Sequence, residues 1–282
     1  MPALFIGHGS PMNTLELNRY TQLWRDLGAG MPRPRAVLAV SAHWYVGLTA
    51  VTAMPQPRTI HDFFGFTPEL NAFAYPAAGD PALAAEVADL VKPLWCGLDR
   101  DAWGLDHGTW SVLAHLFPQA DVPVVQLSLN ATRPHDYHFE LGARLAPLRE
   151  QGVLIVCSGN VVHNLGLLEW DKPDTGRDWA MRFDEAAREL ITTRPEDTIK
   201  LGEHADYARA VPTPDHFLPL LYFAGLAAAS DRKPQVPISG YFGGSLSMTC
   251  YPLDAACPES TDGPGSAPMP DPSVVPPDQS NI

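Results

Sequence analysis

The stretch GVLIVCSGNVVHN, residues 152–164, decides the fold class of this chain. Its first half contains a continuous apolar run from residue 153 to 157, which indicates a strand that is covered on both faces. Small, turn-forming residues follow, and His163 lies just beyond them. The stretch therefore predicts a buried strand of a largely parallel sheet, with a histidine placed beyond the carboxyl end of that strand.

Similar apolar runs recur along the chain and alternate with stretches of helical spacing. This alternation is typical of an α/β fold, and we predict one domain with a mostly parallel or mixed central sheet flanked by helices. Asp80 followed by Pro81 marks a helix start, because an acidic N-cap and a proline in the first turn are both favoured there. Residues 58–78 are predicted to form a long loop. The predicted strands are 3–6, 36–40, 48–54, 122–129, 153–157 and 245–251, and the other predicted helices are 110–117, 135–149, 178–193 and 216–228.

Composition restricts the class of protein. The chain has 282 residues, of which 45% are hydrophobic, so it can bury a sizeable core. With 19 Lys and Arg against 32 Asp and Glu, its net charge of −13 disfavours nucleic acid and anionic membranes as partners. No apolar run approaches the roughly 20 residues of a membrane span, and the start, MPALFIGHGSP, lacks the pattern of a signal peptide. The four cysteines form no C-x-x-C pair. These features favour a cytoplasmic protein.

The last 31 residues differ in composition from the rest of the chain. From residue 252 to 282 they include eight prolines and five acidic residues, with no Lys or Arg. Such a segment buries too little apolar surface to offset the entropy lost on ordering. We therefore predict a catalytic or binding domain over residues 1–251 and a flexible, Pro-rich acidic tail over residues 252–282.

Several of the ten histidines follow predicted strands. His8 lies two residues after the first strand, His43 ends the run AVLAVSAH, and His163 follows the strand in the opening stretch. In an open α/β sheet, ligands bind beyond the carboxyl ends of the strands. We therefore expect these three imidazoles to meet at one edge of the sheet.

His216, in TPDHFLPLLY, reaches the same region from a different kind of element. Pro219 is best tolerated in the first turn of a helix, which places His216 at the amino end of that helix. The positive end of a helix dipole disfavours imidazolium, and the neutral imidazole is the form that binds a metal ion. Four histidines in such positions suit a catalytic metal site with nitrogen ligands.

A simpler interpretation is that these histidines are structural. A single histidine after a strand is commonly a hydrogen-bonded structural residue, and spacing alone leaves both interpretations open. His107, in GLDHGTW, is either a site residue or a loop residue that Asp106 satisfies. His115, His135, His138 and His204 are predicted to be outside the site, and His61 lies among aromatic residues that suit either a pocket or the core.

The blocks that carry these histidines resemble a known family. They are PALFIGHGSPMN, VSAHWY, TIHDFFGF, WGLDHGTW, VPVVQLSL, SGNVVHNL, PTPDHFLPLLY and GSLSM, in this order. Together they resemble the bacterial DOPA-dioxygenase-type family of the class III extradiol ring-cleaving dioxygenases, which includes the catalytic subunit of protocatechuate 4,5-dioxygenase. The resemblance covers roughly residues 1–251, and the Pro-rich tail lies outside it.

The resemblance implies an enzyme that opens a catechol ring next to its two hydroxyls and inserts both atoms of O₂. It implies one divalent metal per chain, Fe(II) for dioxygenase activity or Zn(II). His216 stands where the wider superfamily has a carboxylate ligand, which makes the implied ligand set all-nitrogen and suitable for either metal. Carried over block by block, the implied metal residues are His8, His43, His163 and His216, with His163 also favoured as the acid/base and His107 as a second catalytic candidate.

Two other functions compete with this one. A zinc hydrolase could use the same histidines to activate water, although no H-E-x-x-H motif supplies a carboxylate base beside them. The superfamily fold also occurs in Memo-type proteins, which are regarded chiefly as non-enzymatic interaction modules. The expected partners of this chain are a small catechol and O₂.

Overall fold

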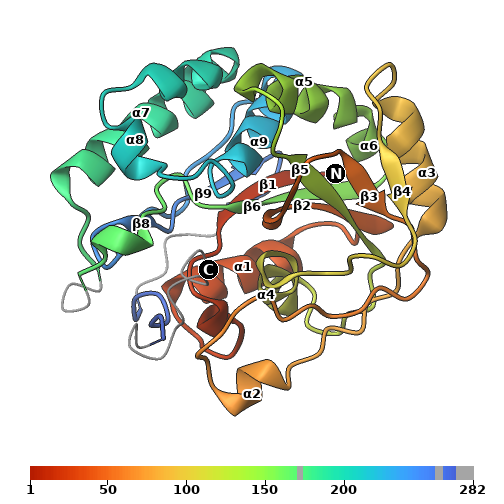
Figure 1. The fold of residues 1–282 in the computed structure, drawn as a ribbon, viewed down its shortest axis with the longest axis horizontal. Helices are drawn as coiled ribbons and strands as arrows, with labels where there is room; N and C mark the ends of the chain where they lie inside the picture. Colours follow the sequence, from red (N-terminus) through yellow and green to blue (C-terminus); the bar gives the residue numbers. More distant parts are fainter. Residues whose placement is uncertain (170–173, 258–262, 271–282) are drawn as a thin grey trace.

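The computed structural model describes residues 1–169, 174–257 and 263–270. Seven strands form one central sheet in the order β4-β3-β5-β2-β6-β1-β9 (Figure 1). Neighbouring strands are parallel except for the pairs β3–β5 and β1–β9. The strands of this sheet are β1 (Ala3–Gly7), β2 (Ala36–Val46), β3 (Ala50–Thr52), β4 (Gly97–Asp99), β5 (Val124–Asn130), β6 (Val153–Gly159) and β9 (Cys250–Leu253). A separate two-stranded ribbon pairs β7 (Tyr241–Phe242) with β8 (Leu246–Ser247).

Helices cover both faces of the sheet, and a buried apolar cluster lies on each side (Figure 1). One layer contains α5 (His135–Leu145), α6 (Pro147–Glu150), α7 (Asp178–Thr193), α8 (Tyr207–Ala210) and α9 (Leu218–Ala228), with α3 (Pro81–Leu90) beside β3 and β4. The opposite layer contains α1 (Arg19–Gly30) and α4 (His107–Leu116). Short elements are α2 (Pro68–Asn71) and the 3-10 helices η1 (Pro11–Thr14), η2 (Leu165–Leu167) and η3 (Pro195–Glu203). This arrangement confirms the predicted α/β fold.

Local chemistry explains where the helices begin. Asp80 caps α3 by accepting a hydrogen bond from Leu83 N at 3.0 Å, as its position before Pro81 predicts. The capping box of Asn18 and Thr21 begins α1, a helix that the strand-centred analysis did not predict. The central helix α9 is buried almost all round, which is consistent with its uniformly apolar sequence.

Several predicted elements differ from those observed. The helix expected over 110–117 begins at His107, and the loop expected over 58–78 contains the short helix α2. The helix expected over 135–149 is divided into α5 and α6 at Pro147, since a proline lacks the N–H that would continue the helix. The strand expected over 245–251 is divided between β8 and β9, which belong to different sheets. The helix expected from residue 216 begins at Leu218, so His216 precedes it by two residues.

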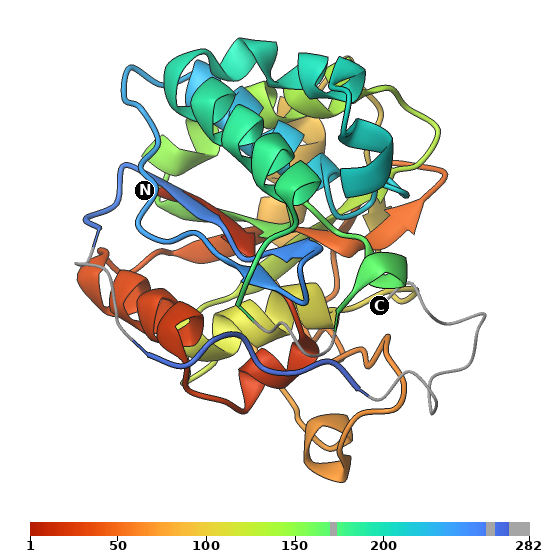
Figure 2. The ribbon, with the colours of Figure 1, turned by 90° about the vertical axis from the view of Figure 1, so that its left-hand side faces the viewer.

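The predicted tail is attached to the body over part of its length. Strand β9 ends at Leu253, so the boundary predicted at residue 251 falls inside a strand. Residues 263–270 lie along η1 and the start of α1, where Ser10 Oγ donates to Pro268 O at 2.7 Å and Arg19 N donates to Pro264 O at 3.1 Å (Figure 2). The rest of the predicted tail, residues 258–262 and 271–282, lies outside the described residues.

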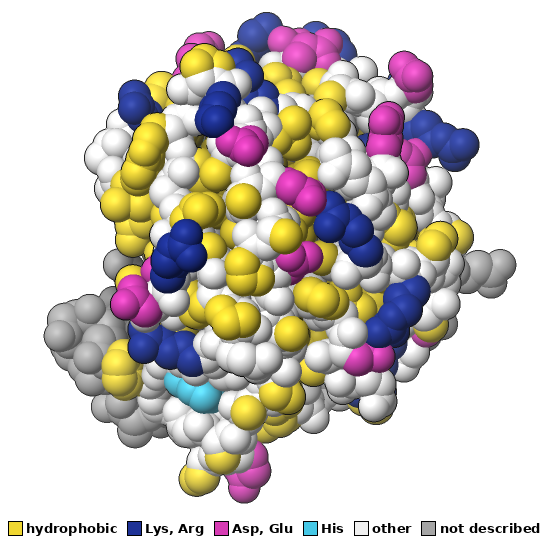
Figure 3. All heavy atoms as spheres, turned by 90° about the vertical axis from the view of Figure 1, so that its right-hand side faces the viewer, with side chains coloured by type: hydrophobic (Ala, Val, Ile, Leu, Met, Phe, Trp, Pro, Cys, Tyr) yellow, Lys and Arg dark blue, Asp and Glu magenta, His cyan; other side chains and the backbone are white. Residues whose placement is uncertain are grey.

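The surface carries both signs of charge. On the face drawn in Figure 3, basic side chains are interspersed with acidic ones and with apolar side chains. Among the helices in the described ranges, none has both the length and the apolar character required to cross a bilayer.

Candidate metal centre

Five histidines meet at the carboxyl ends of the parallel strands. His8 directly follows β1, and His163 lies four residues beyond β6. His43 lies near the end of β2, where the register with β5 shifts between Val40 and Tyr45. His107 is the first residue of α4, and His216 precedes α9. The structure therefore brings together all five residues that the sequence singled out for a metal or catalytic role.

Two glycines allow the chain to approach itself closely at this edge. Gly9 adopts a φ of 62°, a conformation that side chains rarely tolerate, directly after His8. A Cβ atom on Gly159 would lie 2.3 Å from His216 O, and the next residue, Asn160, donates its N–H to that oxygen at 2.8 Å. The end of β6 therefore fixes the backbone position of His216.

The rings of His8, His43 and His216 lie close to one another. His8 Nε2 and His43 Nε2 lie 3.3 Å apart. The ring centroids of His8, His43 and His216 are separated by 5.2 Å, 5.4 Å and 4.9 Å, for the pairs 8–43, 8–216 and 43–216 respectively. A ligand-forming nitrogen of His107 also lies within 4.8 Å of nitrogens of His8 and His43.

The other two rings pack against members of that group. His107 lies against His43 with a centroid separation of 3.8 Å. His163 stacks on His216 with a centroid separation of 3.5 Å and an interplanar angle of 4°. Each flanking histidine thus contacts one ring of the central group at van der Waals distance.

Two carboxylates and a hydroxyl contact the outer nitrogens of these rings. Asp62 Oδ2 lies 3.2 Å from His43 Nδ1 and 3.0 Å from His107 Nδ1. Asp215 Oδ2 lies 2.5 Å from His216 Nδ1. The hydrogen bond to Asp215 holds the proton of His216 on Nδ1 and leaves the lone pair on Nε2.

Ser158 fixes the tautomer of His8 in the same way. The Ser158 hydroxyl donates to Gly108 O at 2.6 Å, so at 2.9 Å it accepts from His8 Nδ1. This leaves the lone pair of His8 on Nε2, the atom that faces His43. His216 Nε2 is buried and has no hydrogen-bond partner. Such a buried lone pair is costly unless it binds a cation or a donor.

Burial and neighbouring rings keep His8 and His43 neutral. Burial lowers the pKa of His8 well below the usual range of an imidazole, and the neighbouring rings of His43 and His216 lower it further. Burial likewise lowers the pKa of His43, with His107 adding to the effect and Asp62 opposing it. Burial raises the pKa of the Asp62 carboxyl, but His107 and His43 lower it by more, so its net pKa is below the usual range. Neutral imidazoles beside an ionised carboxylate are the form in which histidine binds a metal.

The arrangement fits an ion held by nitrogen ligands. Two nitrogens bound to one tetrahedral ion at about 2.0–2.1 Å lie about 3.3 Å apart, which is the separation of His8 Nε2 and His43 Nε2. The buried lone pair of His216 Nε2 gives a third donor without another partner.

Sequence analysis missed Asp62, Asp215 and Ser158. Asp62 lies in a segment predicted only as a loop, and its one signal is its place after His61 in TIHDFFGF. His61 itself contacts Phe73 O instead of the cluster. The ring of His107 pairs with Asp62, whereas Asp106 accepts from Thr109 N and from Ser41 Oγ. The alternative in which Asp106 satisfies the ring of His107 is therefore not observed.

Comparisons with known proteins match this fold and these residues. The profile of the family described as the catalytic LigB subunit of aromatic ring-opening dioxygenase matches residues 4–247. A 4,5-DOPA dioxygenase extradiol from Escherichia coli K12 is 47% identical over 253 residues, which are 88% of this chain and 93% of that protein. A protein of the same name from Beta vulgaris is 32% identical over 263 residues, 88% of this chain and 94% of that protein.

A solved structure has a similar fold. The crystal structure of an uncharacterized protein from Escherichia coli K12 superposes with a TM-score of 0.79 and 41% sequence identity, covering 90% of this chain and 99% of that one. The family match spans most of the chain and includes all five clustered histidines. This chain belongs to the family of the catalytic LigB subunit of aromatic ring-opening dioxygenases.

Proposed function

We propose that this chain is a metal-dependent extradiol dioxygenase, which opens the ring of a small catechol next to its two hydroxyls and inserts both atoms of O₂. The family and the names of its relatives support a ring-opening dioxygenase. The observation that carries the proposal is a group of three closely spaced imidazoles, in which His8 Nε2 and His43 Nε2 lie 3.3 Å apart and the buried His216 Nε2 has no hydrogen-bond partner.

We assign the metal to His8, His43 and His216. Three imidazoles that bind one ion through Nε2 at about 2.0–2.1 Å have ring centroids about 5 Å apart. The separations within this group, from 4.9 to 5.4 Å, agree with that geometry. His107 and His163 each pack against the ring of one group member, with centroid separations of 3.8 Å and 3.5 Å, and this packing favours roles beside the ion for both rings. His163, first expected as both ligand and acid/base, takes only the second role in this proposal.

The ion supplies Lewis acidity and, as Fe(II), redox chemistry that Zn(II) lacks. The chain supplies the geometry. Asp62, Asp215 and Ser158 orient the ligand rings through their Nδ1 atoms. Burial excludes water from the rings, since His8 and His216 are 2% and 1% exposed. A catechol that reaches this edge therefore meets a site whose donors need no rearrangement.

The flanking histidines are suited to move protons. Catechol cleavage requires a group that accepts a hydroxyl proton and later returns a proton to the oxygen being released, and a near-neutral imidazole serves both steps. Asp62 Oδ2 lies 3.0 Å from Nδ1 of His107, and the ring of His107 packs against His43. His163 stacks on His216 at 7% exposure, somewhat more open to solvent than His8, His107 or His216. We assign proton transfer to His163, with His107 as the second candidate.

Oxygen uptake tests the proposal. The protein is stripped of metal, reconstituted anaerobically with Fe(II), and mixed with a panel of catechols that includes DOPA, with a Zn(II)-loaded sample as the control. We expect catechol-dependent uptake and a coloured ring-opened product in the iron form alone. If one metal ion is bound per chain and no catechol supports uptake, the proposal is wrong, and a zinc-dependent hydrolase or a binding protein takes its place.

A further inference from the structure

Part of the acidic tail lies against the loop that carries His8. Asn13 lies five residues after His8 and connects that loop with the tail. Its Nδ2 donates to His8 O at 2.9 Å and to Ser266 Oγ at 3.2 Å, while its Oδ1 accepts from Ala267 N at 2.9 Å. All three contacts are buried. The tail is therefore hydrogen-bonded to the backbone of a proposed metal ligand through one side chain.

An apolar contact extends the attachment to two other loops beside the site. Met269 is buried with Phe242 and Leu246, and Phe66 and Leu165 pack against this cluster. Leu246 forms a β-bridge with His163, and Leu165 lies two residues beyond that histidine. Phe66 belongs to the loop that holds Asp62 and packs on Phe63, which in turn contacts His107. Met269 thus fills the space between loops that approach the histidines from different sides.

This segment lies outside the part of the chain that defines the family. The family profile ends at residue 247, and 90% of this chain covers 99% of the solved Escherichia coli chain. Phe66, Leu165 and Leu246 lie within the residues that the family profile matches, whereas Met269, which packs with them, does not. Met269 therefore covers apolar side chains that belong to the family fold.

We propose that residues 264–269, here named the C-terminal strap, form one wall of the entrance to the histidine site and limit the size of the molecules that reach it. The strap contacts the loop after β1, the loop of Asp62 and the loop of His163, each of which leads to a residue of the site. A methionine at the contact fills an irregular apolar gap, and without it the gap would be open to the apolar part of a larger ligand. The part of this inference that concerns substrates rests on the proposed function.

Chemical modification of histidines in the metal-free protein tests whether the C-terminal strap limits access to the site, and it needs no activity measurement. Diethylpyrocarbonate is applied to the full chain, to a chain that ends at residue 262 and to a chain that ends at residue 270, and each modified histidine is quantified by mass spectrometry. His204, at the end of η3, serves as the internal reference. We expect the rate at His163 to rise several-fold in the chain that ends at residue 262, and to stay at the full-chain value in the chain that ends at residue 270.

A point variant covers the case in which the shorter chain does not fold. Met269→Ala removes the apolar contact alone, and Met181→Ala, at a methionine that is 43% exposed on α7, is the matched control. We expect faster modification of His163 in the first variant and no change in the second. Equal rates in all folded variants, or a chain ending at residue 270 that is as reactive as the one ending at residue 262, would overturn the inference.

Substrate size gives the second readout. With iron-loaded protein, Met269→Ala should lower KM for a catechol with a bulky side chain several-fold and leave KM for unsubstituted catechol unchanged. If no variant cleaves any catechol but histidine modification still depends on the strap, the proposed function fails and the wall stands. If catechols are cleaved with the same size preference in all variants, the strap does not select substrates.

Discussion

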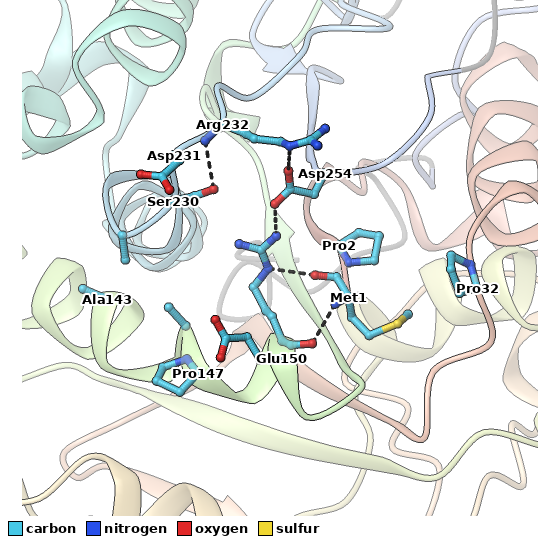
Figure 4. A pocket seen from close by; sticks show the side chains of 13 residues that line it. Met1, Pro2, Pro32, Ala143, Pro147, Glu150, Ser230, Asp231, Arg232 and Asp254 are labelled. Atoms are coloured by element: carbon cyan, nitrogen blue, oxygen red, sulfur yellow. Dashed lines mark hydrogen bonds and ion pairs between the residues drawn. The ribbon is translucent and has the colours of Figure 1, made fainter.

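The two ends of the parallel strands carry polar groups of very different kinds. At the carboxyl ends, five histidines and two carboxylates form a buried cluster, and the lone pair of His216 Nε2 has no partner. At the amino ends, a surface pocket of about 760 Å³ lies beside the starts of β1, β2 and β6 (Figure 4). The pocket is an open hollow, whereas the cluster holds a buried nitrogen atom without a hydrogen-bond partner.

The charges around the pocket satisfy one another. Asp254 accepts a hydrogen bond from Arg149 and forms an ion pair with Arg232, whose Nε lies 3.3 Å from Asp254 Oδ1. The amino group of Met1 donates to Arg149 O at 2.6 Å, and Arg149 Nε donates to Met1 O at 2.9 Å (Figure 4). Among the residues that the structure describes, none that lines this pocket has a buried side-chain polar atom without a partner.

The comparison shows that a surface pocket indicates a functional site less strongly than a buried hydrogen-bond donor or acceptor without a partner. Paired charges at an open surface require no ligand and contribute little to stability. Buried lone pairs that converge require a cation or a donor, because leaving them without one costs free energy. Four substitutions test this contrast between the two ends of the strands.

Removing the proton-transfer group should give the largest loss of activity without loss of metal. We expect His163→Ala to lower kcat by about 10²–10⁴-fold, the usual contribution of a general acid or base, while one metal ion per chain remains bound. His204→Ala is the matched control, because His204 lies outside the cluster. Steady-state oxygen uptake and metal analysis of the same samples check both parts. Loss of metal together with activity would make His163 a ligand.

Removing the charge that orients two rings should weaken metal binding. Asp62→Asn keeps the size of the side chain but no longer holds the Nδ1 protons of His43 and His107. We expect the metal affinity to fall about 10–100-fold, the usual effect of losing a carboxylate behind a histidine ligand. Competition with a chelator measures the affinity. Asp121→Asn, at an exposed ion pair with Arg33, is the matched control, and an equal fall in both variants would refute the orienting role.

A buried acid away from both ends of the strands should affect stability alone. Burial raises the pKa of Asp184 to about 6, although Thr249 Oγ1 and Tyr241 OH donate to its Oδ2. Because this pKa is above that of the unfolded chain, near 3.9, the contribution of Asp184 to stability is complete below about pH 4 and is lost as the pH rises through about 6. Asp184→Asn should therefore increase the free energy of unfolding by about 1–2 kcal/mol at pH 8, and the gain should vanish near pH 4.

Denaturant unfolding at the two pH values measures that difference. Metal content should be the same in Asp184→Asn and in the unaltered chain. A gain in stability that is equal at pH 4 and pH 8 would show that the Asp184 carboxyl is already ionised in the folded state at the lower pH.

Removing the central charge of the pocket should have the smallest effect. Asp254 has a φ of 59°, which asparagine also tolerates, so Asp254→Asn changes the charge with little backbone strain. Its ion pairs with Arg149 and Arg232 are partly exposed, and we expect a loss of about 0.5–1 kcal/mol in unfolding free energy. Metal affinity and oxygen uptake should be unchanged. A drop in either would show that the two ends of the strands are coupled.

Sequence patterns predicted the parts of this molecule that depend on local chemistry. The apolar run at residues 153–157 identified β6, and the same reasoning placed His8, His43 and His163 at one edge of the sheet. These predictions succeed because a strand buried on both faces has few alternative sequences. The α/β class and the family follow from the same blocks.

The remaining features depend on contacts between distant segments. Asp62 lies 45 residues before His107 in sequence and contacts its ring, and no periodicity marks the loop that brings them together. The attachment of Ala267 to Asn13 spans 254 residues within a tail whose composition predicts no ordered structure. Which histidines converge and which only stack is equally a matter of ring geometry, which spacing in the sequence does not encode.

The most direct test of the central assignment is the metal content of five single variants and one double variant. Zinc is titrated into each metal-free protein, and the number of ions bound per chain is measured. His8→Ala, His43→Ala and His216→Ala should each bind zinc much more weakly, the double variant His8→Ala/His43→Ala should bind none, and His107→Ala and His163→Ala should each bind one ion. A double variant that retains one ion per chain, or a His107→Ala variant that loses the ion while His216→Ala keeps it, would contradict the assignment.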